Sequence, residues 1–174
     1  MQLNDFLQTI PTLVDISEDA NHVDWKRYDS DKTIAEFVAG FMAYFPGWLK
    51  FLYQVRAVLV RFLGMKQDGL PQPDDMHPDD VPMIPGAKMG FFEVTAADPD
   101  NYWIAHATEK HLTAYLAVMR DPVAGHLYVV TVVHYHHWTG PVYFNIIRPF
   151  HHIVVHQMSQ SGVRYQPAAA YSAT

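Results

Sequence analysis

Eleven histidines and no cysteines define the side-chain chemistry that this 174-residue chain can offer. His134 and His136 lie two residues apart in a segment of strand periodicity, so they share one face, as paired zinc ligands often do. His152 and His156 lie four residues apart in a helical segment and also share a face. The residues between them lack the glutamate of the metalloprotease motif, and the two pairs are predicted to point in different directions. We therefore expect no metal site and no cofactor.

His111 and His151 are stronger candidates for a functional role, because each lies near the end of an element or near a bend. Pro149 lacks an N–H and leaves the carbonyl of Asn145 without its usual donor. Arg148 or His151 could satisfy that carbonyl, or could point into a cavity beneath the helix. A structural role and a ligand role thus both stay open for His151, as surface exposure and a ligand role do for His111.

Serines and carboxylates give little support for catalysis. None of the five serines lies in a Gly-x-Ser-x-Gly motif, and the chain has no glycine-rich phosphate loop. Glu93 and Glu109 are the acids nearest to predicted strands. A glutamate that faced an apolar cavity could act as a general acid, whereas one at the edge of a sheet would be exposed. The absence of cysteine excludes disulfides and thiolate nucleophiles.

Hydrophobic periodicity predicts the elements that must position these residues. A short strand (22–28) precedes a helix that begins with a capping box of Thr33 and Glu36. The next helix (48–63) is apolar almost all round, so we predict that it is sandwiched between other elements, with a partner or a membrane surface as alternatives. Four strands joined by short turns then predict an antiparallel meander: 88–96, 102–108, 112–120 and 126–138.

The last helix is predicted to start at Thr139-Gly140-Pro141, to bend at Pro149 and to end at Gly162. Its apolar residues form one stripe, which we expect to pack on the sheet: Val142, Tyr143, Ile146, Ile147, Phe150, Ile153, Val154 and Met158. Its polar residues are expected on the opposite, exposed face: Asn145, Arg148, His152, His156 and Ser159.

This order of elements predicts a single α+β domain over residues 1–174 in the helix-grip arrangement. That fold is a curved antiparallel sheet with two short helices and one long kinked C-terminal helix. A ferredoxin-like sandwich and a cone-shaped α+β barrel fit less well, since two paired helices precede the meander. Outside the core we expect an N-terminal segment (1–20), a lid-like loop rich in proline and aspartate (65–86) and a mobile tail (163–174).

Composition narrows the classes of partner. The net charge is −6 and the twelve Lys and Arg are dispersed, which argues against nucleic acid, because phosphate binding requires clustered cations. The long uncharged stretch (122–147) contains four histidines and a Gly-Pro breaker, so no membrane span is expected. The N-terminus lacks the basic and apolar blocks of a signal peptide, and the location expected by default is cytoplasmic.

Several motifs carry a family resemblance. They are Tyr44-Phe45-Pro46-Gly47-Trp48 with Arg56 and Gly64, Lys110-His111-Leu112, and Gly140-Pro141-Val142-Tyr143 leading into Ile147-Arg148-Pro149-Phe150-His151. Together they resemble the bacterial family called domain of unknown function 2867, over residues 22–160. That family is similar to the SRPBCC helix-grip superfamily of START-type lipid carriers and the birch-pollen allergen. The resemblance implies this fold, with members alone or appended to dehydrogenase-like domains, and implies no activity. Pro141 and His152 stand where the family pattern has arginine.

We expect the domain to bind a small, largely apolar molecule non-covalently in a cavity between the sheet and the last helix. The polar anchors would be Tyr115, Thr131, Tyr135, Arg148, His151 and His111. Both faces of strand 126–138 are apolar, so the inward set is either Thr131, Tyr135 and His137 or His134, His136 and Trp138. One alternative is a helix-grip enzyme of cyclase, isomerase or hydrolase type that uses a buried His or Glu. Another is an interaction module that docks a dehydrogenase-like partner or forms a homodimer.

Overall fold

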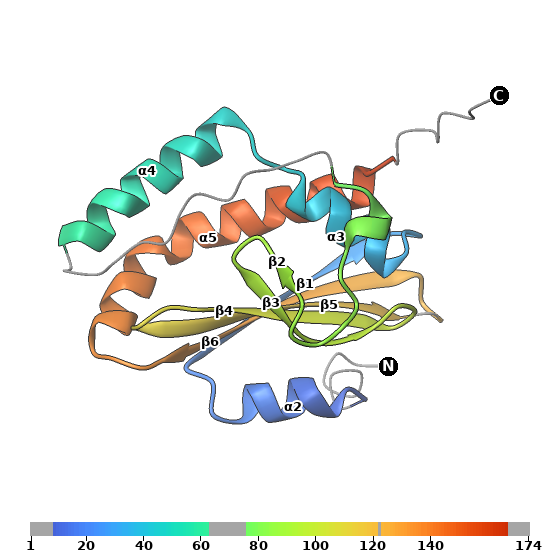
Figure 1. Cartoon of the computed structure of the whole chain (residues 1–174), viewed down its shortest axis with the longest axis horizontal. Helices are drawn as coiled ribbons and strands as arrows, with labels where there is room; N and C mark the ends of the chain where they lie inside the picture. The colour runs from blue at the N-terminus through green and yellow to red at the C-terminus, as the bar shows by residue number, and fades with distance from the viewer. Residues whose placement is uncertain (1–8, 63–75, 122, 167–174) are drawn as a thin grey trace.

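Six antiparallel strands form one sheet in the order β1-β6-β5-β4-β3-β2. The computed structural model describes residues 9–62, 76–121 and 123–166 (Figure 1). The strands are β1 (His22–Asp29), β2 (Lys88–Met89), β3 (Phe92–Asp98), β4 (Tyr102–Thr108), β5 (Leu112–Asp121) and β6 (His126–Tyr135). The predicted α+β class and meander are confirmed. The first strand of the meander is a hairpin of β2 and β3, because Gly90 turns the chain with a φ of 60°.

Helices cover both faces of the sheet. α3 (Ile34–Met42), α4 (Gly47–Phe62) and α5 (Thr139–Arg164) lie over one face, and α2 (Pro11–Glu18) lies against the other (Figure 1). α2 occupies part of the segment 1–20, for which we predicted no helix. Its signals are a proline in the first turn and Leu13, which is buried against the sheet. The order of one strand, two helices, a meander and a long C-terminal helix is the predicted helix-grip arrangement.

The tightest helix packing joins α3 to the C-terminal half of α5. α3 begins with the predicted capping box, in which Thr33 and Glu36 satisfy each other's backbone N–H groups. Phe37 of α3 is fully buried, and a Cβ placed on Gly162 would lie 2.8 Å from its carbonyl oxygen. Gly162 therefore lies inside α5 as a point of close helix contact, and the helix continues past the predicted end to Arg164.

The predicted apolar stripe of α5 is wrong in part. Val142, Ile146, Phe150 and Ile153 are exposed, whereas Phe144 and Ser159 are buried. His152 and His156, predicted on the exposed face, both contact the edge strand β1; His152 is half-buried there, whereas His156 is exposed as predicted. His152 Nδ1 donates to Asp24 at 3.1 Å, and His156 Nδ1 lies 3.3 Å from the Tyr28 hydroxyl. The polar side chains that β1 directs toward the helix explain the rotation, because buried polar groups require partners. Figure 1 shows α5 changing direction after its first turns, as expected for the internal Pro149.

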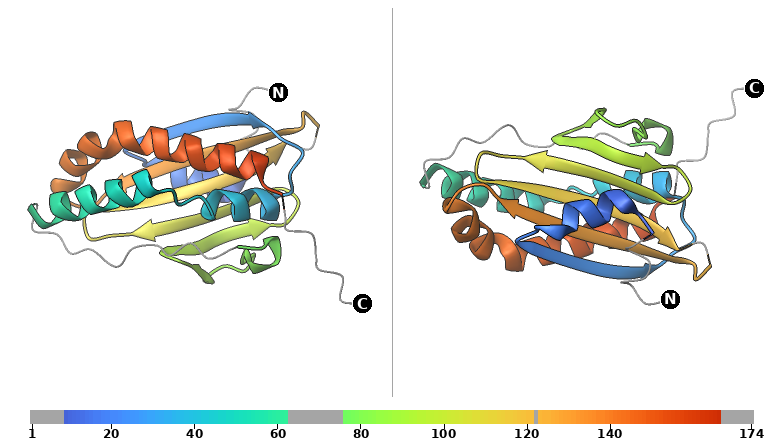
Figure 2. Two further views of the ribbon diagram at one scale, coloured as in Figure 1. Left: turned by 90° about the horizontal axis from the view of Figure 1, so that it is seen from above. Right: turned by 90° about the horizontal axis from the view of Figure 1, so that it is seen from below.

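The prediction that the second helix is sandwiched is also wrong. Leu49 of α4 is buried, but Trp48, Phe51 and Val55 are exposed, and Phe51 reaches 62%. Figure 2 shows α4 and α5 side by side as the outermost elements of their face of the molecule. The core formed by the described residues therefore does not account for the apolar surface of α4.

Two predicted segments lie only partly within the described residues. Residues 65–75 of the lid-like loop and 167–174 of the tail lie outside them. The described part of the loop, 76–86, contains the 3-10 helix η1 (Pro78–Asp80) and the buried Val81. Trp103 donates its indole N–H to the carbonyl of Pro82 at 3.0 Å, so this stretch is anchored to the core beside α3.

Candidate functional site

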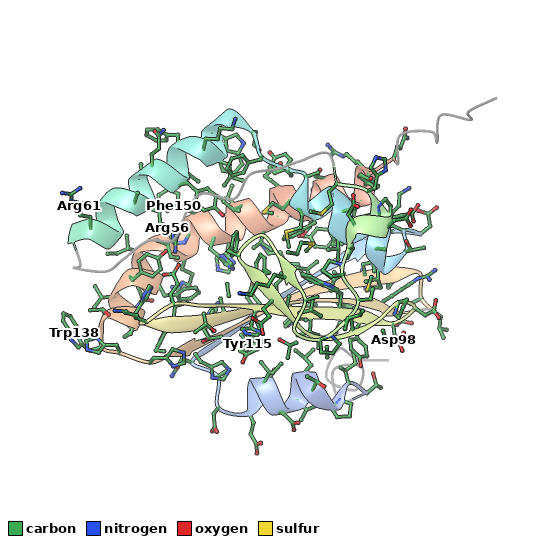
Figure 3. All side chains as sticks on the ribbon, in the orientation of Figure 1. Arg56, Arg61, Asp98, Tyr115, Trp138 and Phe150 are labelled. Carbon is green, nitrogen blue, oxygen red and sulfur yellow. The ribbon has the colours of Figure 1, made fainter. Side chains whose placement is uncertain are left out.

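The alternation of β6 decides which predicted anchors face α5. Thr131 and Tyr135 share a face with Leu127 and Val129, which belong to the core beneath α3 and α5. Tyr135 also packs with Tyr143 and Phe144 of α5. Thr131 and Tyr135 of the first predicted set therefore point inward, whereas His137 of the same set follows the end of β6 and is exposed. Tyr115 lies apart from them, because it packs on the α2 face of β5 (Figure 3).

The α2 face contains the predicted histidine pair of β6. His134 donates from Nε2 to the carbonyl of Ile16 at 2.7 Å, and His136 Nε2 lies 2.8 Å from the hydroxyl of Thr113. A shallow hollow beside them is lined by Asp15, Asp19, Asn21, Tyr115, His134 and His136, among others. Within the described part of the chain, no three His, Asp or Glu side chains gather closely enough to hold a metal ion. His152 and His156 lie across the sheet, so the two pairs do not meet.

A group of polar and aromatic side chains between β1, β6 and α5 contains three of the six predicted anchors. The ring of Phe144 lies 4.9 Å from His22, and 6.1 Å from both Tyr135 and His151. The Nε2 atoms of His22 and His151 are buried, and neither has a hydrogen-bond partner among the described residues. We call His22, Tyr135, Phe144, Arg148 and His151 the His22–His151 site.

Electrostatics keep both imidazoles of the His22–His151 site neutral. Burial, together with the neighbouring His152, lowers the pKa of His151 from 6.5 to about 4. Burial also lowers the pKa of His22, and the charge of Arg148 acts in the same direction. At neutral pH each ring therefore presents one N–H donor and one acceptor nitrogen. Burial raises the pKa of Tyr135, and Arg148 opposes this rise.

The polar residues of β1 position α5 above this site. Asp24 accepts a hydrogen bond from His152, and Lys26 donates from Nζ to the carbonyl of His152 at 3.1 Å. These contacts join the edge strand to the helix close to the bend at Pro149. They hold the preceding residue, His151, with its ring under the helix.

A second cluster lies between α4, the β4–β5 turn and the start of α5, and we call it the Arg56 cluster. Arg56 donates from Nε to the Tyr143 hydroxyl at 2.5 Å and forms an ion pair with Glu109. His111 Nε2 lies 3.4 Å from the second oxygen of Glu109, and its side chain is only 3% exposed. Figure 3 shows Arg56 on the side of α4 that faces α5.

The electrostatics of the Arg56 cluster favour a charged Arg56 beside a neutral His111. Burial lowers the pKa of His111 more than Glu109 raises it. Burial alone would lower the pKa of Arg56, but Tyr143 and Glu109 outweigh this and raise it. Burial also raises the pKa of Tyr143, although Arg56 opposes the rise. The cluster therefore attaches α4 to the rest of the molecule through charge-assisted hydrogen bonds.

Sequence reasoning assigned no functional role to His22, Phe144, Arg56 or Tyr143. The alternation of β1, with His22, Asp24 and Lys26 on one face, was a signal for a polar inward face. Arg56 and Tyr143 were part of the motifs that carry the family resemblance, but their separation of 87 residues hid their contact. His111 was expected at a turn, with either surface exposure or a ligand role. In the structure its side chain is buried.

A family model described as Protein of unknown function (DUF2867) matches residues 16–158. The chain belongs to this family. No curated protein matches it. The family match includes both clusters, from His22 to His151.

Proposed function

We propose that this member of the DUF2867 family binds a small, largely apolar molecule non-covalently at the His22–His151 site. The observation that supports this most directly is the pair of buried Nε2 atoms without a partner among the described residues. An unpaired buried polar group costs about 1–3 kcal/mol. A ligand that supplied one donor or acceptor to each ring would recover that energy, so the two atoms favour a polar group placed between apolar walls.

The surroundings of the site suggest the chemistry of the ligand. Phe144 and Val133 supply buried apolar surface, and Arg148 supplies an exposed cation beside His22 and Tyr135. An apolar body with one carbonyl or carboxylate group suits this combination, because Arg148 favours an acceptor and the neutral imidazoles can donate. The order of elements also supports our proposal that the DUF2867 family is part of the SRPBCC helix-grip superfamily.

The first test is the native mass of the purified, untagged full chain compared with its denatured mass. We expect the native mass to exceed the denatured mass by that of one small organic molecule. The apolar fluorophore anilinonaphthalene sulfonate then serves as a probe of the same site. We expect His22→Leu and His151→Leu each to weaken probe binding about tenfold, the effect of losing one good hydrogen bond.

The matched control is His136→Leu, which removes a histidine from the opposite face of the sheet. We expect it to leave probe binding unchanged. Equal binding by all three variants and the wild type, together with no excess native mass, would show that the His22–His151 site binds no such molecule.

An enzymatic function has one observation in its favour, the buried His111 beside Glu109 in the Arg56 cluster. A neutral imidazole close to a carboxylate can act as a general base. His111→Gln distinguishes this proposal from ligand binding. It should abolish turnover of any substrate found in a screen while leaving the native-mass excess in place.

A further inference from the structure

We propose that the outer surface of α4 and α5 docks on an anionic phospholipid membrane. This proposal is independent of the ligand site, because it rests on different side chains. The surface consists of Trp48, Phe51 and Val55 of α4 with Val142, Ile146, Phe150 and Ile153 of α5. These are seven of the fourteen large hydrophobic side chains that are exposed in the described part of the chain.

The two helices are placed to present these side chains together. Figure 2 shows α4 and α5 side by side and uncovered when the molecule is seen from above. Figure 1 shows that the sheet and α2 lie on the far side of them. Phe150, half exposed, lies on the part of α5 that faces α4 (Figure 3). Seven exposed apolar side chains thus come from two neighbouring helices of one layer.

The distribution of charge selects the partner. α4 and α5 contain five of the twelve Lys and Arg of the chain and none of its eighteen Asp and Glu. Lys50, Arg61 and Arg164 of these helices are exposed and lie outside the ligand site. The rest of the chain is strongly acidic, and α2 on the far side contains Asp15 and Glu18. In a chain of net charge −6, the two helices that contain half of the described exposed large apolar residues thus contain cations and no acids.

A bilayer interface with anionic lipids complements both properties at once. Apolar and aromatic side chains enter the boundary between headgroups and acyl chains, while Lys and Arg remain at the level of the phosphates. A second copy of the chain is less suitable, because the same surface on both partners would bring like charges together. In the part of the chain that the structure describes, no helix is long and apolar enough to cross a membrane.

Vesicle binding of the full-length protein tests this proposal. The probes are vesicles of phosphatidylcholine alone and of phosphatidylcholine and phosphatidylglycerol in equal amounts, with binding measured by co-sedimentation. We expect binding only to the mixed vesicles, and weaker binding as salt screens the charges. Each cation near an anionic surface strengthens binding roughly fivefold, so Lys50→Glu with Arg61→Glu should reduce binding at least tenfold. Phe51→Glu should also reduce it at least about tenfold.

Matched controls separate the surface from general changes of charge or fold. Arg27→Glu with Lys88→Glu changes the net charge equally but lies away from α4 and α5, and Phe91→Glu replaces another half-exposed phenylalanine. We expect both to bind like the wild type, and all variants to melt at similar temperatures. Equal binding to neutral vesicles, equal loss in the controls, or no vesicle binding would each overturn the proposal. A dimer that Phe51→Glu dissociates, without lipid binding, would assign the surface to a second copy.

Discussion

The two ends of the helical layer differ in how their side chains are used. At one end α3 packs on the C-terminal half of α5, with Phe37 fully buried and Gly162 allowing close approach. At the other end α4 and the start of α5 leave Phe51 and Phe150 exposed and bury polar groups beneath them. The first end therefore supplies stability, and the second holds the groups available for recognition. A protein that binds molecules has to keep such groups out of its best-packed core.

The largest expected contrast is between two phenylalanines on the two ends. Phe37→Ala should reduce the free energy of unfolding by about 4 kcal/mol, because it removes a fully buried ring and leaves a cavity. Phe51→Ala should change it by no more than about 0.5 kcal/mol, since the ring is largely exposed. Urea unfolding followed by circular dichroism measures both free energies. Similar losses of unfolding free energy in the two variants would contradict the difference in packing between the two ends.

The pH dependence of stability tests the polar end. The pKa of His151 is about 4 when folded and 6.5 ordinarily, so only the unfolded chain takes up a proton between these values. Stability is fully present above the ordinary pKa and is lost as pH falls toward 4. His151→Gln removes this loss, so the drop in unfolding free energy from neutral pH to pH 4 should shrink by about 3 kcal/mol.

The control for this prediction is His136→Gln on the α2 face, which should leave the pH dependence of stability close to that of the wild type. An unchanged pH profile in His151→Gln would show that the ring is protonated or accessible in the folded protein.

A smaller effect is expected at the helix contact of the packed end. Gly→Ala inside a helix ordinarily stabilises by about 0.5–1 kcal/mol. In Gly162→Ala the new Cβ would lie 2.8 Å from a backbone oxygen of α3, so we expect a net loss of about 2 kcal/mol. Gly47→Ala at the start of α4 meets no atom within 4 Å and should not destabilise. Thermal melts compare the two, and a stabilised Gly162→Ala would mean that α3 and α5 can separate at no cost.

The smallest expected effect on global stability is at the attachment of α4. Arg56→Met removes the contacts to Tyr143 and Glu109 and should cost about 1 kcal/mol, because the ion pair is partly exposed. Hydrogen exchange should increase in α4 while α3 remains protected. Arg61→Met, which removes an exposed arginine from the same helix, is the matched control. Unchanged exchange in Arg56→Met would show that other contacts hold α4.

Local sequence signals were sufficient to predict most of the helices and strands. The capping box at Thr33 correctly predicted the start of α3, and four strand-like segments joined by short turns predicted the meander. These predictions succeeded because caps and alternation depend on neighbours within four residues. The prediction of which side of α5 is buried was wrong in part, because helical periodicity groups residues on one face without showing which element that face contacts. Both its apolar and its polar sides had partners available, and β1 supplied the polar ones.

The candidate site was predicted only in part for the same reason. Thr131, Tyr135, Arg148 and His151 were expected at the interface of the sheet and the last helix. Thr131 and Tyr135 face α5, whereas Tyr115 points to α2. His22 was not identified, because its approach to Phe144 joins residues at opposite ends of the chain.

By itself the sequence determined the fold class, most of the order of the elements from β1 onward and the cation-only composition of the two outer helices, since these follow from local patterns and counting. Only the tertiary structure decided which face of β6 meets α5, which side of α5 is buried, and that α4 lies exposed. Those outcomes depend on long-range pairing such as Arg56 with Tyr143 and His152 with Asp24. A buried polar group is stable wherever it finds a partner, and the chain reveals that partner only when it is folded.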